Sequence, residues 1–206
     1  MLDAFFGWPF IITFIVLMIF GFFFGSRREK RYRQAWRSFA ERHGLEFRAG
    51  HRQHWALSLS GEFRGHAVVV ERVVVSSGES STAYTDYTVR LHPAWKTGMA
   101  MRYWKFRDRI AEVFRGQDGH TVGDEDFDAR FTIRGPVSVP VARALEQPEV
   151  QEVLLEMGSK MTIEGGALTL RTPGTPESAV EIEDILNRVC DRVEVLNGTT
   201  GQFLPS

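Results

Sequence analysis

The sequence predicts an α+β fold in which an N-terminal transmembrane helix continues into an amphipathic helix, followed by an antiparallel sheet with helices packed on one face. Three observations support this prediction. The first 26 residues carry almost no charge, apolar residues alternate with a period of two after Gly44, and helical spacing returns from Val137. The 206 residues therefore divide into an anchor at 1–26, a basic juxtamembrane helix at 27–43 and a soluble α+β domain at 44–206.

The uncharged stretch from Ala4 to Ser26 contains eight phenylalanines and no charged side chain. As a helix it would rise ~34 Å, which is enough to cross a hydrocarbon core of ~30 Å. A cleaved signal peptide is not expected, because the only charge before the stretch is Asp3 and no small-residue cleavage site follows it. Gly21 and Gly25 have the spacing that lets two transmembrane helices pack closely.

Basic residues follow the uncharged stretch directly, with seven Lys or Arg side chains from Arg27 to Arg42 against two glutamates. Positive charges beside a span stay on the cytoplasmic side, which predicts a single-pass protein with its N-terminus outside and its C-terminal domain in the cytoplasm. The alternative is that these side chains only orient and solvate the helix. The candidates for contact with anionic lipid, named here the basic collar, are Arg27, Arg28, Lys30, Arg31 and Arg33.

Charge and cysteine content limit the function of the domain. Residues 1–43 have a net charge of +4 and residues 44–206 a net charge of −5, which together give −1. An acidic domain without a basic face is not expected to bind nucleic acid. The single cysteine, Cys190, is typical of a reducing compartment. It is expected to be a small core residue rather than a nucleophile, because Asp191 and Glu194 would oppose a thiolate.

An apolar stripe runs along the basic helix, and Gly44 is placed to end that helix in a left-handed conformation. The residues of the stripe are Tyr32, Ala35, Trp36, Phe39, Ala40 and His43. Alternation then predicts half-buried antiparallel strands. Their inward residues are Trp55, Leu57 and Leu59, then Tyr87, Val89 and Leu91, then Met99, Met101 and Tyr103.

Two segments interrupt this alternation. Val68 and Val70 have one parity and Val73 and Val75 the other, which predicts a β-bulge that returns all four to one face. The polar run 76–82 is expected to be the loop of a hairpin.

Residues 105–115 are predicted to form a short helix that Gly116 ends.

Helical spacing and turn residues define the C-terminal part of the chain. Two short helices are predicted at 140–146 and 148–157, each with proline in the first turn. Gly165-Gly166 predicts a two-residue hairpin turn that pairs 163 with 168 and 161 with 170. A closing helix is expected at 177–196, with inward residues Val180, Ile182, Ile185, Leu186, Val189, Val193 and Leu196.

The acidic segment does not read as a metal site. Asp124, Asp126 and Asp128 have the first spacings of a calcium loop, but Ala129 and Gly135 occupy its sixth and twelfth positions. As a strand, the segment would turn Asp126, Asp128 and Arg130 outward and Phe127, Ala129, Phe131 and Ile133 inward. The histidines at 51, 54, 66, 92 and 120 form no recognisable zinc set, so that neither metal nor cofactor is expected.

The run Val122-Gly123-Asp124, then Phe127-Asp128, then Phe131, followed by a helical stretch, a glycine-turned hairpin and a final helix, resembles an uncharacterised family of bacterial membrane-anchored proteins with a cytoplasmic α+β domain. The resemblance covers residues 30–200. It implies location in the bacterial inner membrane and structural roles for Gly123, Asp124, Phe127, Asp128 and Phe131, but no activity, substrate or cofactor.

Three functions remain open. The first is a membrane-anchored, non-catalytic interaction or accessory module, whose partners are the lipid bilayer and either another membrane protein or a second copy. The second is a domain that senses a small ligand or lipid headgroup, and the third is a hydrolase or transferase with an unrecognised site. An exposed apolar patch would favour the first and a closed apolar pocket the second. The third would be favoured if several titratable side chains converged in one cleft. The candidates for such a cleft are Asp124, Asp126, Asp128, His92 and His120.

Overall fold

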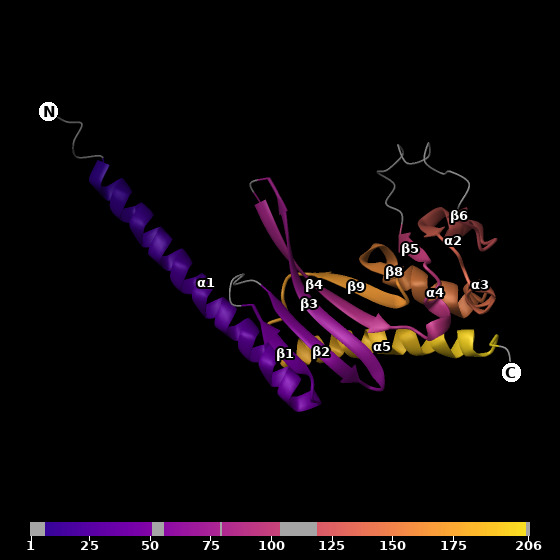
Figure 1. Ribbon diagram of the computed structural model, residues 1–206. Coiled ribbons are helices and arrows are strands. Elements are labelled where there is room, and N and C mark those ends of the chain that lie inside the picture. Colours follow the sequence, from indigo (N-terminus) through magenta and orange to yellow (C-terminus); the bar gives the residue numbers. More distant parts are fainter. Residues whose placement is uncertain (1–6, 51–55, 79, 104–118, 205–206) are drawn as a thin grey trace.

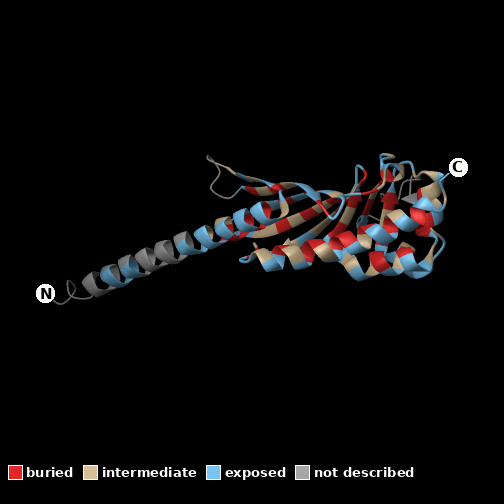
Figure 2. Cartoon of the chain, turned by 90° about the horizontal axis from the view of Figure 1, so that it is seen from below, coloured by how far each residue is buried: buried red, intermediate tan, exposed pale blue. Residues whose placement is uncertain are grey.

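The computed structural model describes the backbone of residues 7–50, 56–78, 80–103 and 119–204 and, in the N-terminal part of the first helix, the side chains of residues 12–14 and 16. Within this part of the chain, nine strands form one antiparallel sheet in the order β1-β2-β3-β4-β9-β8-β5-β7-β6 (Figure 1). The view in Figure 2 looks onto the long helices α1 and α5, which lie on one side of the sheet. The predicted α+β class is therefore confirmed.

The N-terminal helix α1 (Gly7–His43) is continuous, so the basic helix directly prolongs the uncharged stretch. The predicted apolar stripe faces the core, and Trp36 and Phe39 are 0% exposed. Gly44 has φ +69°, and the Leu45 N–H donates to the Ala40 carbonyl at 2.9 Å, which ends the helix as expected. Among the residues whose side chains are described, no helix combines the length and the apolar character needed to cross a membrane.

The first four strands are β1 (Glu46–Ala49), β2 (Leu57–Phe63), β3 (His66–Ser77) and β4 (Ser80–Arg90). They form an antiparallel meander in which each strand pairs with the next. The predicted inward residues of β2 and β4 are buried, and Leu91 follows directly after β4. Trp55 lies outside the described residues.

The predicted bulge in β3 is wrong. The ladder between β3 and β4 runs without a break from Val68 opposite Val89 to Ser77 opposite Ser80. Val68 and Val70 are buried, whereas Val75 is 43% exposed. The physical reason is that the hairpin extends beyond the body of the sheet, where neither face is covered (Figure 1). The strands also extend further into the polar run than expected.

The middle of the chain contributes the 3₁₀ helix η1 (Pro93–Trp95) and the strands β5 (Ala100–Tyr103), β6 (Gly119–His120) and β7 (Phe131–Arg134). Met99 and Met101 are buried as predicted. The helix predicted at 105–115 lies outside the described residues.

Before β7, the acidic segment that was considered as a strand is instead a helix, α2 (Glu125–Arg130). The Asp124 carboxylate accepts a hydrogen bond from the Phe127 N–H at 2.8 Å and so caps the helix, which outweighs the alternation of the sequence. Phe127 is buried as predicted, but Ala129 is exposed.

The predicted C-terminal helices and hairpin are confirmed. They are α3 (Val139–Leu145), α4 (Pro148–Met157), the short η3 (Gly158–Lys160), β8 (Met161–Glu164) and β9 (Ala167–Pro173). Ile163 lies opposite Leu168 and Met161 opposite Leu170. The β8–β9 hairpin is inserted between β4 and β5, so it joins the N-terminal meander to the rest of the sheet.

The closing helix α5 (Ala179–Gly201) packs along the sheet, with Ser178 accepting a hydrogen bond from the Glu181 N–H. All predicted inward residues are buried except Val180, which is 59% exposed. At ~100° per residue, Val180 lies ~200° from Ile182 and hence on the opposite side of the helix. Its assignment to the apolar face was therefore wrong.

Candidate functional site

The basic collar is largely exposed to solvent, but two of its members form ion pairs within the chain. Arg28 donates from Nε to Glu177 Oε1 at 2.9 Å, which raises the pKa of Arg28. Arg33 donates to Glu29 Oε1 at 3.1 Å. Arg27, Lys30 and Arg31 are exposed side chains on the same stretch of α1. The sequence predicted that the collar lies on one helix. In the structure, two of its members, Arg28 and Arg33, form ion pairs with carboxylates of the same chain.

A polar seam joins α1 to α5 further along. Arg42 donates to Glu183 at 3.3 Å, and His43 Nε2 lies 3.6 Å from the same carboxylate. Phe39, His43 and Phe63 pack their rings against one another beside this seam, with centroids 4.5 to 5.9 Å apart. The second half of α1 is thus fixed to the domain by both charge and packing.

Gly21 and Gly25 lie in the helical backbone of α1, at positions where no side-chain surroundings are described. Their predicted role in packing against another helix stays a prediction.

The motif of the resemblance forms a compact local structure. Asp128 accepts hydrogen bonds from the backbone N–H groups of Val122 and Gly123, at 2.9 and 3.0 Å. Gly123 has φ +93°, a conformation that favours glycine. The rings of Phe127 and Phe131 pack with centroids 4.7 Å apart. Each of these residues holds the loop, α2 and β7 together.

The acids and histidines considered for chemistry do not gather into one site. Within the described residues, no group of three or more His, Cys, Asp and Glu side chains is placed to hold a metal ion. His92 Nδ1 accepts a hydrogen bond from the Ala94 N–H at 3.2 Å and so begins η1. Asp126 is exposed on α2, and His120 lies on the edge strand β6. The histidines at 51 and 54 lie outside the described residues.

Cys190 lies on α5 with 0% exposure. Burial is the main cause that raises the pKa of its thiol to about 11, with Glu194 and Asp191 acting in the same direction and Arg64 opposing them. The thiolate needed for nucleophilic attack is therefore disfavoured at neutral pH, as the sequence led us to expect.

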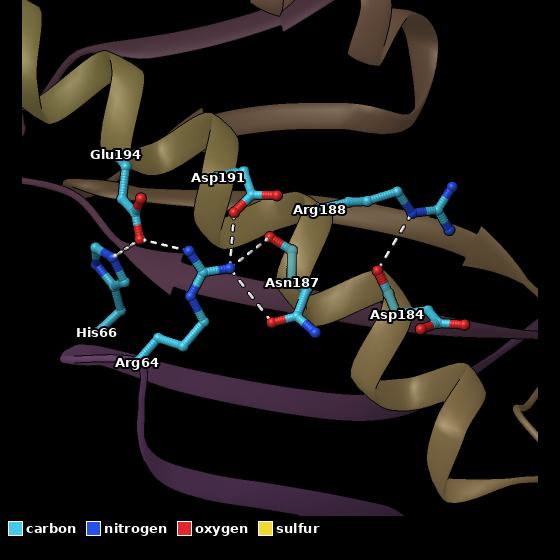
Figure 3. A network of polar contacts seen from close by, with 7 residues as sticks. All are labelled: Arg64, His66, Asp184, Asn187, Arg188, Asp191 and Glu194. Atoms are coloured by element: carbon cyan, nitrogen blue, oxygen red, sulfur yellow. Dashed lines mark hydrogen bonds and ion pairs between the residues drawn. The ribbon is translucent and has the colours of Figure 1, made fainter.

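The densest polar network was not foreseen from the sequence. It joins Arg64, in the turn between β2 and β3, to one side of α5 (Figure 3). Arg64 Nη1 lies 2.7 Å from Asp191 Oδ1, and Nη2 lies 2.9 Å from Glu194 Oε1. Nη1 also donates to the side-chain oxygen of Asn187 at 3.3 Å, and His66 Nε2 lies 3.6 Å from Glu194. The hydrogen bond to Asp191 raises the pKa of Arg64.

Arg64 has φ +52°, and it is the only non-glycine residue with positive φ in the described chain. With Gly65 at φ +79° it forms the two-residue turn of the hairpin, a place where asparagine or glycine is usual. An arginine in that turn is the one signal in the sequence that could have identified the network. The arrangement can bind and orient α5, and in it the carboxylates of Asp191 and Glu194 are paired with the Arg64 guanidinium.

Comparison with family models, with curated proteins and with solved structures found no match to this chain. The resemblance seen in Val122-Gly123-Asp124 and Phe127-Asp128 therefore stays a prediction. Function must be inferred from the residues of this chain alone.

Proposed function

We propose that the protein is a single-pass, membrane-anchored, non-catalytic interaction module of the bacterial inner membrane, with its N-terminus outside and its α+β domain held at the cytoplasmic surface. Its partners would be the bilayer and either another membrane protein or a second copy.

The observation that carries this proposal is the continuity of α1. One uninterrupted helix begins at Gly7, outside the body of the molecule, and continues to His43, with Trp36 and Phe39 buried in the core (Figures 1 and 2). The large apolar side chains that are described in its outer part, Ile12, Phe14 and Val16, are 53 to 60% exposed. A projecting helix with large exposed apolar side chains in an uncharged stretch requires an apolar environment, which a bilayer supplies.

An interaction role is favoured over catalysis by what the reactive residues do. Asp124 caps a helix, Asp128 accepts two backbone N–H groups, and His92 begins η1. Cys190 is buried with a raised pKa. Each of these groups already has a structural role in the fold. A domain held at a membrane is therefore better explained by contacts between its surface and a partner than by catalysis.

The anchor is tested by cell fractionation of the full chain and of residues 27–206. The full chain should sediment with membranes and resist extraction by alkaline carbonate, and residues 27–206 should be released into the soluble fraction. Recovery of both forms in the soluble fraction would contradict the anchor.

Orientation is tested by thiol labelling of intact cells, for which the buried Cys190 gives a low background. Asp3→Cys should react with an impermeant maleimide from outside, whereas Ser159→Cys, at an exposed position on the body of the domain, should react only after lysis. The reverse pattern would overturn the predicted topology.

The interaction role is tested by affinity purification of the full chain from detergent-solubilised membranes, with residues 27–206 as the matched control. A stoichiometric partner that is lost with residues 1–26 would place the contact on the outer part of α1. Purification of both forms without a partner, and as monomers, would contradict the interaction role.

A further inference from the structure

The β3–β4 hairpin ends in a two-stranded arm, defined here as residues 72–77 and 80–83. In the described chain, β2 pairs with β3 only as far as Glu71, and β9 pairs with β4 only from Tyr84 onward. Apart from the Ala83 carbonyl, which accepts a hydrogen bond from the Gly174 N–H at 2.9 Å, the two described strands of the arm pair only with each other. Val74 and Val75 on the arm are 38% and 43% exposed. Natural proteins usually cover or charge such an exposed apolar ribbon, so this arm needs an explanation.

The base of the arm is attached to α1. Arg72 Nη1 lies 2.8 Å from Glu29 Oε2, and the Arg72 guanidinium lies over the Tyr32 ring, 5.3 Å from its centroid. The Arg72 side chain is only 7% exposed, so the contact is closely packed. Glu29 is three residues beyond Ser26, the last residue of the uncharged stretch. The arm thus begins at the level at which the proposed anchor ends.

The arm is long enough to pass that level. From Arg72 to Ser77 the strand advances ~17 Å, whereas α1 rises only ~4.5 Å from Glu29 back to Ser26. Figure 1 shows the arm and the outer part of α1 leaving the body of the molecule on the same side. A bilayer around the uncharged stretch would therefore meet the arm in its headgroup layer.

The arm is almost uncharged, and the basic residues beside it on α1 complement an anionic bilayer surface. Between Arg72 and Asp86 the only charged residue is Glu79, and the others are valine, serine, threonine, glycine, alanine and tyrosine. A segment with so few charges loses little charge solvation when it enters the layer between headgroups and acyl chains. The exposed collar residues Arg27, Lys30 and Arg31 lie on α1 just beyond Ser26 and complement anionic headgroups there.

We propose that the arm is a second membrane contact, which lies in the headgroup layer of an anionic bilayer beside α1. A single helix leaves the domain free to rotate about the helix axis, and a second contact fixes that rotation. This inference rests on the proposed function, because it requires α1 to be the anchor.

The test uses the full chain in vesicles of phosphatidylcholine and phosphatidylglycerol, with an environment-sensitive fluorophore on one introduced cysteine. Val75→Cys reports on the arm. Val69→Cys is the matched control, because it lies on the same face of the same strand with a similar exposure of 37%, but within the body of the sheet. Phe14→Cys reports on the anchor. Lipids that carry a nitroxide quench the fluorophores that they contact.

We expect quenching and a shift of emission to shorter wavelength at 75, neither effect at 69, and quenching at 14. Quenching at 14 without quenching at 75 would overturn the arm contact and leave the anchor intact. Absence of quenching at 14 would overturn both proposals. Energy transfer between fluorophores at 75 on different copies, in place of quenching by lipid, would assign the arm to a second copy and also overturn the lipid contact.

Discussion

At the scale of single residues, Arg64 shows how a locally unfavourable choice is stabilised by distant contacts. A left-handed conformation is costly for a residue with a Cβ atom. The side chain offsets that cost through Asp191 and Glu194, which lie more than 120 residues away in the sequence. Arginine is therefore less favourable in this turn than glycine or asparagine would be, but it links the β2–β3 hairpin to α5.

Two substitutions separate the backbone cost from the side-chain gain. Arg64→Ala should lower the melting temperature, since it keeps the unfavourable backbone conformation and loses the contacts to α5. Arg64→Asn should lower it less, because asparagine tolerates positive φ. The loss in the alanine variant should shrink in high salt, as expected for exposed ion pairs. Equal melting temperatures for the two variants at all salt concentrations would contradict this explanation.

Cys190 should make stability depend on alkaline pH. The thiol ionises near its ordinary pKa of 9.0 in the unfolded chain but near about 11 in the folded protein. Between these values the unfolded state binds fewer protons, so the free energy of unfolding falls as pH rises, and below pH 9.0 the effect vanishes. Denaturant titrations should show this slope.

The matched variant for this measurement is Cys190→Ala. Its absolute free energy of unfolding changes, but the fall of that free energy with rising pH just above 9.0 should be absent. The region below pH 10.0 is the informative one, because burial also raises the pKa of Tyr87 from 10.0 and adds a similar slope at higher pH. An unchanged slope in the alanine variant would assign the effect to other groups.

At the scale of elements, the β8–β9 hairpin was predictable because its turn residues and its alternation agree. Gly165 and Gly166 have φ +61° and +74°, as the two-residue turn requires. A Cβ atom at 166 would lie 3.1 to 3.3 Å from Lys96, whereas a Cβ atom at 165 would meet nothing within 4 Å. The second glycine is therefore constrained by packing as well as by conformation.

Gly165→Ala and Gly166→Ala should both lower the free energy of unfolding, by about 1 kcal/mol from the left-handed backbone alone. Gly166→Ala should lower it further, because of the close approach of Lys96. Gly165→Asn should be nearly neutral. Chemical denaturation of the three variants measures these differences, and equal losses for the two alanine variants would mean that Lys96 moves aside.

Other elements could not be predicted, for identifiable physical reasons. The alternation around Phe127 matches a strand, but the cap formed by Asp124 selects a helix. The opposite parity of Val73 and Val75 reflects a strand that leaves the core rather than one that bulges. The Arg64 network depends on which turn lies against which helix, and a local pattern carries no such information. Periodicity therefore predicted the helices and strands that are regular along their length and have one face covered by the core.

At the scale of the whole molecule, the second half of α1 belongs to the core. Tyr32, Trp36 and Phe39 join the same buried cluster as the sheet and α5. The unit that can be separated from the uncharged stretch therefore begins at residue 27.

Residues 27–206 should fold cooperatively in solution, and residues 44–206 should not, because the latter exposes the core that α1 covers. Trp36→Ala in the longer form should cost about 3–5 kcal/mol. Gln34→Ala, at an exposed position of the same helix, should change stability little. Thermal and denaturant unfolding measure both, and a cooperative transition in residues 44–206 would contradict the assignment of α1 to the core.

The insertion of the β8–β9 hairpin between β4 and β5 has a consequence for synthesis on the ribosome. β4 ends at Arg90 and its partner β9 ends at Pro173, so 83 further residues must be synthesised before β9 is complete. At common elongation rates this interval lasts roughly 4 to 17 s, whereas a hairpin forms in microseconds. The nascent meander therefore waits with an open edge on β4, and during this period pairing with a wrong strand competes with folding.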